Sequence, residues 1–383
     1  MDVAIAACRD YSPEEVRRAL DEVLAPFGGL SWVTPGMRVA IKANLVSARR
    51  PEAAVTTHPA LLCALSRMLT ERGASVVIGD SPGGLYNAAY VGRIYSACGL
   101  RECEKYGARL NDNFGQKTAR FPDAVEAREF VSTAYLDASD AIIDFCKLTT
   151  HGMMGMTAAA KNLFGVVPGT TKPEYHFRYP TAERFADMIV DLNEYFRPRI
   201  CICDAVEGME GNGPTQGTPR HIGALLAGVS PHRLDLACAK LIGLGVQDVP
   251  TLAAAHRRGL VPERAEELAC SQPLDDFLIP DYGLIPLRGT QFENEYRGVL
   301  GKLVSRFLRA ALASRPQADK ASCVGCGECA RICPARAIEM CGRLPVIDRS
   351  ACIRCFCCQE FCPKGAMRVR RAPLARIVNR KGV

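Results

Sequence analysis

Two short cysteine motifs near the C-terminal end of this sequence have the spacing that iron–sulfur clusters require. Residues 323–334 read CVGCGECARICP and residues 352–363 read CIRCFCCQEFCP, so each motif follows the pattern C-x2-C-x2-C-x3-C-P. In bacterial iron–sulfur proteins this spacing directs three cysteines to one 4Fe-4S cluster and the fourth to a second cluster. Gly325 and Gly327 fit where the backbone must pass close to a cluster. The two motifs together predict two 4Fe-4S clusters.

The fourth cysteine of each motif lies too far along the chain to complete its own cluster, so we expect it to bind the other one. The first cluster is predicted to be held by Cys323, Cys326, Cys329 and Cys362. The second cluster is predicted to be held by Cys352, Cys355, Cys358 and Cys333. Cys341 and Cys357 fall outside the pattern, and the proline-anchored spacing selects Cys358 over Cys357. A zinc site or a disulfide framework does not explain two matched sets of four cysteines.

The composition favours a protein of a reducing compartment. The 383 residues include 19 cysteines, and those outside the two motifs show no pairing rhythm of the kind that disulfide-rich secreted proteins have. The N-terminal stretch MDVAIAACRD lacks the features of a secretory signal, and no apolar run is long enough to span a membrane. We therefore expect a cytoplasmic protein of an anaerobic, oxygen-poor cell interior.

The positive charge is concentrated at the C-terminal end. Residues 364–383 carry seven Lys or Arg and no Asp or Glu, which leaves 41 basic against 41 acidic residues in the rest of the chain. A short basic tail without interleaved aromatic residues is a weak signal for nucleic acid, so we expect no nucleic-acid partner. The tail is predicted to be a solvated arm or to dock on an acidic surface, either that of an electron carrier or that of the chain's own large domain.

The first 310 or so residues show an α/β pattern. It predicts a mostly parallel sheet with flanking helices. Apolar strands are predicted at residues 2–7, 38–42, 75–80, 141–147, 199–204 and 224–229. Helices are predicted at residues 60–71, 181–197 and 231–242, and Ser12 with Glu15 predicts a capping box for a further helix that ends near Leu24.

The predicted domains follow from changes in this pattern. Residues 1–313 form the α/β domain, in one or two lobes, and an amphipathic helix at 296–313 ends it. A polar linker is predicted at 314–320, followed by a small α+β ferredoxin-like domain at 321–371 and the basic tail at 372–383. A linker this short keeps the clusters close to the large domain.

Ligands of parallel sheets bind beyond the carboxyl ends of the strands, and three of the predicted strands end in polar or glycine-rich loops. The candidate cofactor-binding residues at these ends are Lys42, Asn44, Asp80, Asp204, Glu210 and Asn212. Asp204, Glu207 and Glu210 could bind a divalent cation, but acidic residues at strand ends also cap the helices that follow, and the sequence leaves both interpretations open.

The stretch from His151 to His176 is rich in glycine and presents Lys161 and Asn162 after an alanine-rich turn. A helix start with a lysine nearby is a natural anion site, so we expect Lys161, His176 and His151 to be catalytic and Asn162 to contact a cofactor. A divalent metal or an organic cofactor near Lys161 is an additional expectation. The structural alternatives are a solvated helix lysine and two hydrogen-bonded histidines of the core.

Three segments carry a family resemblance. The sequence GDSPGG at 79–84, KNLFGVVPG at 161–169 and EGNGP at 210–214 resemble the family called domain of unknown function 362, whose members often carry a C-terminal two-cluster ferredoxin. A more distant likeness connects His151, Lys161 and His176 with the nickel-pincer lactate racemases. The first resemblance implies an iron–sulfur oxidoreductase, and the second implies a cleft around Lys161.

These observations lead to three functional hypotheses. The first is an iron–sulfur oxidoreductase that passes low-potential electrons from two 4Fe-4S clusters to a small, anionic substrate bound in the α/β domain. The second is a non-catalytic electron carrier or adaptor that docks on a redox protein. The third is a nickel-pincer-type isomerase with an accessory ferredoxin. The sequence does not predict the oligomeric state.

Overall fold

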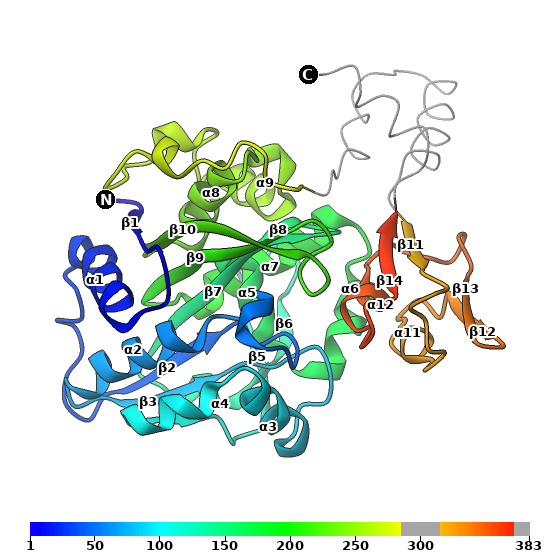
Figure 1. Ribbon diagram of the computed structural model, residues 1–383, viewed down its shortest axis with the longest axis horizontal. Coiled ribbons are helices and arrows are strands. Elements are labelled where there is room, and N and C mark those ends of the chain that lie inside the picture. The colour runs from blue at the N-terminus through cyan, green and yellow to red at the C-terminus, as the bar shows by residue number, and fades with distance from the viewer. Residues whose placement is uncertain (285–314, 371–383) are drawn as a thin grey trace. The chain divides into compact units, whose positions relative to one another are not determined.

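The structure is a computed structural model that describes residues 1–284 and 315–370. The chain divides into two compact units, Met1–Leu284 and Ile285–Val383. We refer to them as the large unit and the C-terminal unit, and each is described by itself (Figure 1). The predicted helix at 296–313 and the basic tail at 372–383 lie outside the described residues.

The large unit is built on a mixed sheet in which most neighbouring strands are parallel. The strand order is β1 (Ala4–Ala7), β10 (Thr218–Gly228), β9 (Ile200–Glu210), β7 (Ala141–His151), β2 (Arg38–Ala43), β3 (Ser75–Gly79) and β4 (Ala108–Leu110), and β8 (Gly155–Thr157) pairs with β7. The strands from β9 to β4 are parallel, and β10 is antiparallel to both of its neighbours. The predicted α/β fold with a mostly parallel sheet is therefore confirmed.

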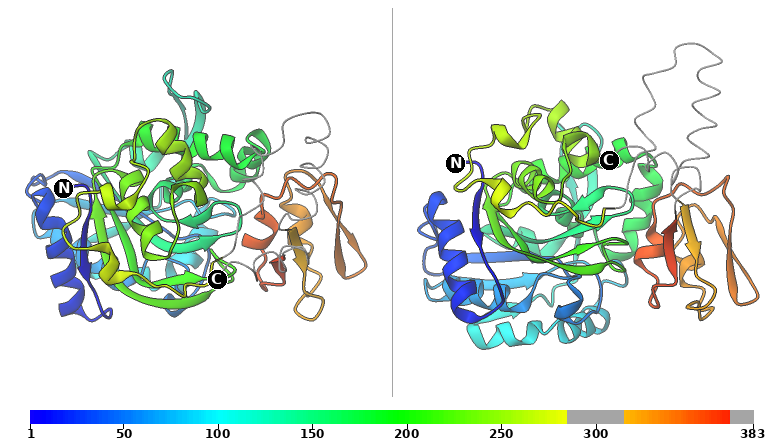
Figure 2. Two further views of the ribbon diagram at one scale, coloured as in Figure 1. Left: turned by 90° about the horizontal axis from the view of Figure 1, so that it is seen from above. Right: turned by 45° about the horizontal axis from the view of Figure 1, so that its top comes forward.

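Helices cover both faces of this sheet (Figures 1 and 2). On the first face lie α1 (Pro13–Leu24), α2 (Pro59–Thr70), α3 (Ala88–Ala97) and the 3-10 helix η3 (Leu100–Tyr106). On the second face lie α5 (Ala159–Asn162), α7 (Ala182–Phe196), α8 (Pro231–Leu241) and α9 (Pro250–Arg257). The first face packs against alternate residues of the central strands, among them Ile41, Phe145 and Ile202. Because side chains alternate along a strand, the residues between them face the second layer.

One local expectation is wrong, and the position of the first strand was not predicted. Ser12 lies at the N-cap position of α1, but its side chain makes no capping hydrogen bond, and Glu15 accepts a hydrogen bond from the backbone N–H of Arg9 instead. The first strand does not join the parallel part of the sheet, because β1 lies at the edge and pairs antiparallel with β10. The chain returns to β1 through the β9–β10 hairpin, which a reading of local pattern could not show.

The remaining elements of the large unit are short. They are α4 (Ala134–Asp137), α6 (Lys172–Arg178) and a separate antiparallel hairpin of β5 (Gln116–Arg120) and β6 (Glu129–Thr133). Within residues 1–284 and 315–370, no helix combines the length and the apolar character that crossing a membrane would require.

The described residues of the C-terminal unit, 315–370, form two short two-stranded sheets and two short helices. Strand β11 (Arg315–Ala318) pairs with β14 (Met367–Arg370), and β12 (Ile338–Cys341) pairs with β13 (Leu344–Ile347). Each cysteine motif contains one of the helices, α11 (Glu328–Arg331) or α12 (Cys357–Glu360). Residues 315–318 therefore form a strand, although the sequence predicted a linker there. This small α+β unit agrees with the predicted ferredoxin-like fold class.

Candidate functional site

The cysteines of the two motifs interleave in the C-terminal unit. The four predicted to hold the first cluster, Cys323, Cys326, Cys329 and Cys362, line one cavity. Burial raises the pKa of the Cys329 thiol, and the neighbouring charges of Cys362 and Cys326 raise it further. The last cysteine of the second motif thus lines the same cavity as the first three of the first motif.

The second predicted set is also brought together. Burial raises the pKa of Cys358 well above its usual range, and Cys355, Cys352 and Cys333 are the neighbouring groups that raise it further. Cys357 instead hydrogen-bonds with Cys355, and this contact and its burial raise its own pKa. Cys341 lies exposed at the end of β12.

The backbone around these thiols turns through the left-handed region in both motifs. Gly325 and Gly327 have φ angles of 72° and 73°, and the matching positions of the second motif, Arg354 and Phe356, have 58° and 59°. The backbone N–H of Ala337 donates to Cys333 Sγ at 3.3 Å, and that of Ala366 donates to Cys362 Sγ at 3.2 Å. Amide hydrogen bonds of this kind tune cluster ligands.

Thiol ligands, glycine turns and N–H to sulfur hydrogen bonds all suit a cubane cluster, in which each cysteine binds a different iron atom. In the described parts of both units, no three His, Cys, Asp or Glu side chains lie close enough together to hold a single metal ion. The thiols and the N–H to sulfur hydrogen bonds of this unit fit an iron–sulfur cluster.

In the large unit, the predicted residues Lys42 and Asp80 lie at the carboxyl ends of β2 and β3 and bind each other. The Lys42 ammonium is fully buried and lies 2.8 Å from Asp80 Oδ1. It also donates to the carbonyl oxygen of Ala43 at 2.8 Å and to Asn162 Oδ1 at 3.1 Å. An ammonium has three donors. All three of the Lys42 donors are used inside the protein.

Asp144 of β7 adds a second carboxyl group to this cluster. It accepts a hydrogen bond from Asn162 Nδ2 at 2.6 Å and is fully buried. Burial raises the pKa of Asp144 to about 8, although Lys42 and the Asn162 hydrogen bond act in the opposite direction. We call Lys42, Asp80, Asp144 and Asn162 the Lys42 network. It holds one buried ammonium with two carboxyl groups, of which one keeps its proton at neutral pH.

The segments 79–84 and 161–169 pack directly on each other beside this network. The backbone N–H of Gly169 donates to Ser81 Oγ at 2.6 Å, and the Lys172 ammonium donates to the carbonyl oxygens of Ser81 and Val167 at 2.6 Å. A Cβ atom on Gly165 would lie 2.2 Å from Asp80 Oδ1, and one on Gly169 would lie 2.0 Å from the Gly84 carbonyl oxygen. These glycines are thus needed for close approach.

Lys161 and His176 both lie against Phe164. The Lys161 side chain is half-buried and its Nζ is 5.1 Å from the centre of the Phe164 ring. The buried His176 ring stacks on Phe185 at 4.2 Å and meets Phe164 edge to face at 5.7 Å. His151 is fully buried at the end of β7, and its Nδ1 accepts the backbone N–H groups of Met153 and Met154. The structure thus groups Lys161 with His176, while His151 closes a turn.

The start of α5, where we expected an anion to bind, is already occupied by a side-chain carboxyl group. Asp235 of α8 accepts hydrogen bonds from the backbone N–H groups of Ala159 and Ala160, at 2.7 and 3.2 Å. Burial raises the pKa of Asp235 well above its usual range. A ligand near Lys161 would therefore be bound by side chains and not by these amides.

A second buried ion pair lies on the other face of the sheet. Lys147 of β7 is 2.8 Å from Asp204 Oδ2, and both side chains are fully buried. The Lys147 ammonium donates to the Tyr11 hydroxyl at 3.0 Å, and that hydroxyl donates to Asp204 Oδ1 at 3.0 Å. The backbone N–H of His58 also donates to Asp204, at 3.0 Å.

The rings of Tyr11 and His58 stack with their centres 3.5 Å apart. Burial lowers the pKa of His58 to about 4 and raises that of Tyr11 far above its usual value. We call Tyr11, His58, Lys147 and Asp204 the Lys147 network. Of these four residues, only Asp204 was predicted from the sequence as a site residue. A lysine inside the apolar strand AIIDFCK was the signal that could have revealed the pair.

The other candidate cofactor-binding residues make contacts of their own. Asn44 follows β2, its backbone N–H donates to Thr57 Oγ1 at 3.0 Å, and its side-chain oxygen accepts the backbone N–H of Val46 at 3.3 Å. Glu210 accepts the backbone N–H of Gly283 at 2.8 Å, and Asn212 is half-buried in the loop between β9 and β10. None of these hydrogen bonds joins the side chains of Asn44 and Glu210 to Lys42 or Lys147.

Comparisons with known proteins agree with this division of the chain. A 4Fe-4S binding domain matches residues 315–338. The thylakoid-associated protein of Synechocystis sp. is 31% identical over 316 residues, which are 77% of this chain and 94% of that protein.

Two solved structures are similar to part of this chain. The lactate racemase apoprotein from Thermoanaerobacterium thermosaccharolyticum has 11% identity and a TM-score of 0.42, over 64% of this chain and 58% of that one. A protein from Thermotoga maritima has 12% identity and a TM-score of 0.39, over 61% and 60%. This chain thus spans about three fifths of the length of either structure. The model of the "Domain of unknown function (DUF362)" matches residues 39–240, more than half of the sequence, and the chain belongs to this family.

Proposed function

We propose that this protein is an iron–sulfur oxidoreductase that carries two 4Fe-4S clusters and passes low-potential electrons to a small, anionic substrate of the large unit. The observation that carries the proposal is the cavity in the C-terminal unit. Three cysteines of one motif and the last cysteine of the other motif line it together, which is the arrangement that two interleaved clusters need.

The roles of the chain's own residues follow from this assignment. Cys323, Cys326, Cys329 and Cys362 hold the first cluster, and Cys352, Cys355, Cys358 and Cys333 hold the second. A bound 4Fe-4S cluster supplies one-electron transfer at a potential that hydrogen bonds and solvent exposure adjust. The N–H groups of Ala337 and Ala366 donate to one ligand of each set and stabilise its negative charge. Thiolate ligands require a reducing compartment, which supports a cytoplasmic location.

Lys161 is the residue we propose to bind the anionic substrate. Lys42 is fully buried with all of its donors used, whereas Lys161 is half-buried at the end of α5. His176 lies on the same aromatic ring and is the proposed acid–base partner of Lys161, and Asn162 is its sequence neighbour. His151 is proposed to support the turn before this segment.

The cluster assignment is tested by iron analysis and electron paramagnetic resonance of protein purified without air. We expect about eight irons per chain, since each cubane contains four. Cys358→Ser should lose about four irons and the signal of one reduced cluster. Cys357→Ser is the matched control, because Cys357 is next to the proposed ligand Cys358 in the sequence but is not itself proposed to bind a cluster. Full iron content in Cys358→Ser together with a loss in Cys357→Ser would reverse the assignment.

The substrate assignment is tested by anaerobic reoxidation of the reduced protein with a panel of small anionic metabolites. A substrate should reoxidise the clusters of the wild type, and Lys161→Met should slow this by about a hundredfold without loss of iron. Lys117→Met is the control, because that lysine is exposed on β5 and pairs with Asp137. Failure of every metabolite with the wild type would remove the support for an enzyme.

A second candidate is an electron carrier that docks on an acidic redox protein. Residues 315–370 contain ten Lys or Arg and five Asp or Glu, a net charge of +5 next to the proposed clusters. This candidate predicts that an acidic redox protein oxidises the clusters in the absence of any metabolite, at a rate that falls steeply with salt concentration. The same rate at low and at high salt would contradict it.

A further inference from the structure

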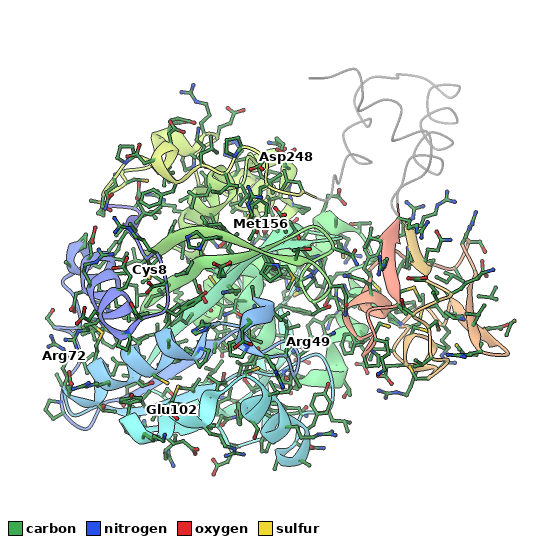
Figure 3. The ribbon with its side chains drawn as sticks, viewed as in Figure 1. Cys8, Arg49, Arg72, Glu102, Met156 and Asp248 are labelled. Carbon is green, nitrogen blue, oxygen red and sulfur yellow. The ribbon has the colours of Figure 1, made fainter. Side chains whose placement is uncertain are left out.

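Two buried thiols of the large unit lie in direct contact. Cys63 is on α2 and Cys103 is on η3, directly after Glu102, which is labelled in Figure 3. Their sulfur atoms are 2.8 Å apart, and the residues are 7% and 0% exposed. Ordinary contacts between unbonded heavy atoms are about 3.5–4.0 Å. The pair is therefore closer than packing alone produces.

The chemical environment favours exchange at Cys63. The hydrogen bond with Cys103 lowers the pKa of the Cys63 thiol, although burial and the charge of Glu102 oppose it, and the charge of Lys105 adds a smaller lowering effect. A thiol that ionises more easily is the better nucleophile toward a disulfide near neutral pH. Cys63 is also the one of the two with some exposed surface. It is thus the thiol that meets an oxidant first.

We propose that Cys63 and Cys103 form a reversible disulfide, a redox site of the large unit that is separate from the iron–sulfur motifs. The oxidant is a low-molecular-weight disulfide of the glutathione class. The Cys63 thiolate attacks one of its sulfur atoms, which breaks the oxidant's bond and releases one thiolate. The Cys103 thiolate then attacks the Cys63 sulfur and releases the second thiol. The protein loses two protons and two electrons, and the oxidant becomes two thiols.

The bond would join two segments next to the Lys147 network. Helix α2 begins after His58, the residue that stacks on Tyr11, and the Cys103 thiol lies 4.0 Å from the carbonyl oxygen of Pro59. η3 in turn leads into the edge strand β4. Oxidation would therefore fix the start of α2 against the edge of the sheet, and it would close a loop between residues 63 and 103.

The test uses the full-length protein under anaerobic conditions in buffers with graded ratios of reduced to oxidised glutathione. Free thiols are alkylated in acid-unfolded samples, and the digest is analysed by mass spectrometry. We expect a peptide pair joined through Cys63 and Cys103, in an amount that follows the glutathione ratio and is reversed by reduction. The oxidised form should melt at a temperature higher by at least about 5 °C.

Cys63→Ser and Cys103→Ser should each remove the joined peptide. Cys98→Ser should keep it, because the thiol of that buried cysteine contacts the Ser47 carbonyl oxygen and no sulfur. A parallel sample is oxidised with diamide. Because diamide is smaller than oxidised glutathione, it tests whether the pair can form a disulfide even if glutathione cannot reach Cys63. Full alkylation of both cysteines after diamide, or glutathione bound to Cys63 without the joined peptide, would overturn the proposal.

Discussion

The two buried lysines of the large unit lie in networks of different charge on opposite faces of the same sheet. Strand β7 contributes to both, because Asp144 and Lys147 are three residues apart and point to opposite sides. Lys147 has one carboxylate, Asp204, and a tyrosine hydroxyl that bonds to both. Lys42 has two carboxyl groups, those of Asp80 and Asp144, linked through Asn162.

The difference shows how a buried site balances its charge. In the Lys147 network one cation meets one anion, so neither partner can be neutralised alone without leaving the other buried and unpaired. In the Lys42 network the second acid is surplus, and burial keeps Asp144 protonated by raising its pKa to about 8. The first network depends on its charges, and the second depends on close packing and on a retained proton.

The largest expected effect on stability comes from replacing the acid of the Lys147 network, Asp204, by asparagine. The same substitution at Asp144 of the Lys42 network serves as the comparison. Asp204→Asn should lower the free energy of unfolding by about 3–5 kcal/mol, because it leaves the Lys147 ammonium buried without its anion. Asp144→Asn should cause no such loss at pH 7, because an amide of the same shape replaces a neutral acid and needs no proton on folding. Urea unfolding followed by the fluorescence of Trp32, the only tryptophan of the sequence, measures both variants. Equal losses would contradict the comparison.

A smaller effect is expected from filling the space beside the Lys42 network. Gly165→Ala would bring a Cβ atom to 2.2 Å from Asp80 Oδ1 and 2.5 Å from Lys42 Nζ, so the ion pair must shift. We expect a loss of about 1–3 kcal/mol in the same urea assay. Gly92→Ala in α3 is the control, since the nearest atom is the end of the Arg101 side chain at 3.8 Å, and a gain of about 0.5–1 kcal/mol is expected there.

The last prediction concerns how the free energy of unfolding changes with each pH unit. The pKa of Asp144 is raised in the folded state from its ordinary 3.8 to about 8. Between pH values of about 4 and 8 the folded protein therefore binds one more proton than the unfolded chain, and stability falls by about 1.4 kcal/mol per pH unit from this group. The difference in unfolding free energy between wild type and Asp144→Asn, measured from pH 5 to pH 8, should show this slope. A difference that is constant with pH would refute it.

Local sequence pattern was sufficient for most of the fold. The predicted strand at 75–80 appears as Ser75–Gly79, and the predicted helix at 181–197 appears as Ala182–Phe196. Strands β7 and β9 extend past their predicted ends at residues 147 and 204, because their last residues pair with β8 and β10. These hairpins depend on partners that periodicity does not reveal.

The parts of the candidate site that lie within a short stretch of sequence could be predicted, and the parts that join distant segments could not. The cysteine spacing alone indicated which thiols should lie together, because the geometry of a cluster is encoded within a dozen residues. The role of Lys42 was not visible in this way, since its three acceptors come from β2, β3 and α5. His58 and Tyr11 were missed for the same reason, because a stacked pair 47 residues apart leaves no mark in a local pattern.

The carboxyl group of Asp235 at the start of α5 has one further consequence for recognition. With the amides of Ala159 and Ala160 already bound, any anion at the proposed site must be held mainly by the ammonium of Lys161. An ammonium on a long stem is a point charge that accepts many geometries, whereas a row of amides selects a fixed shape. Such a site would sort its ligands by charge and size more than by the arrangement of their oxygen atoms.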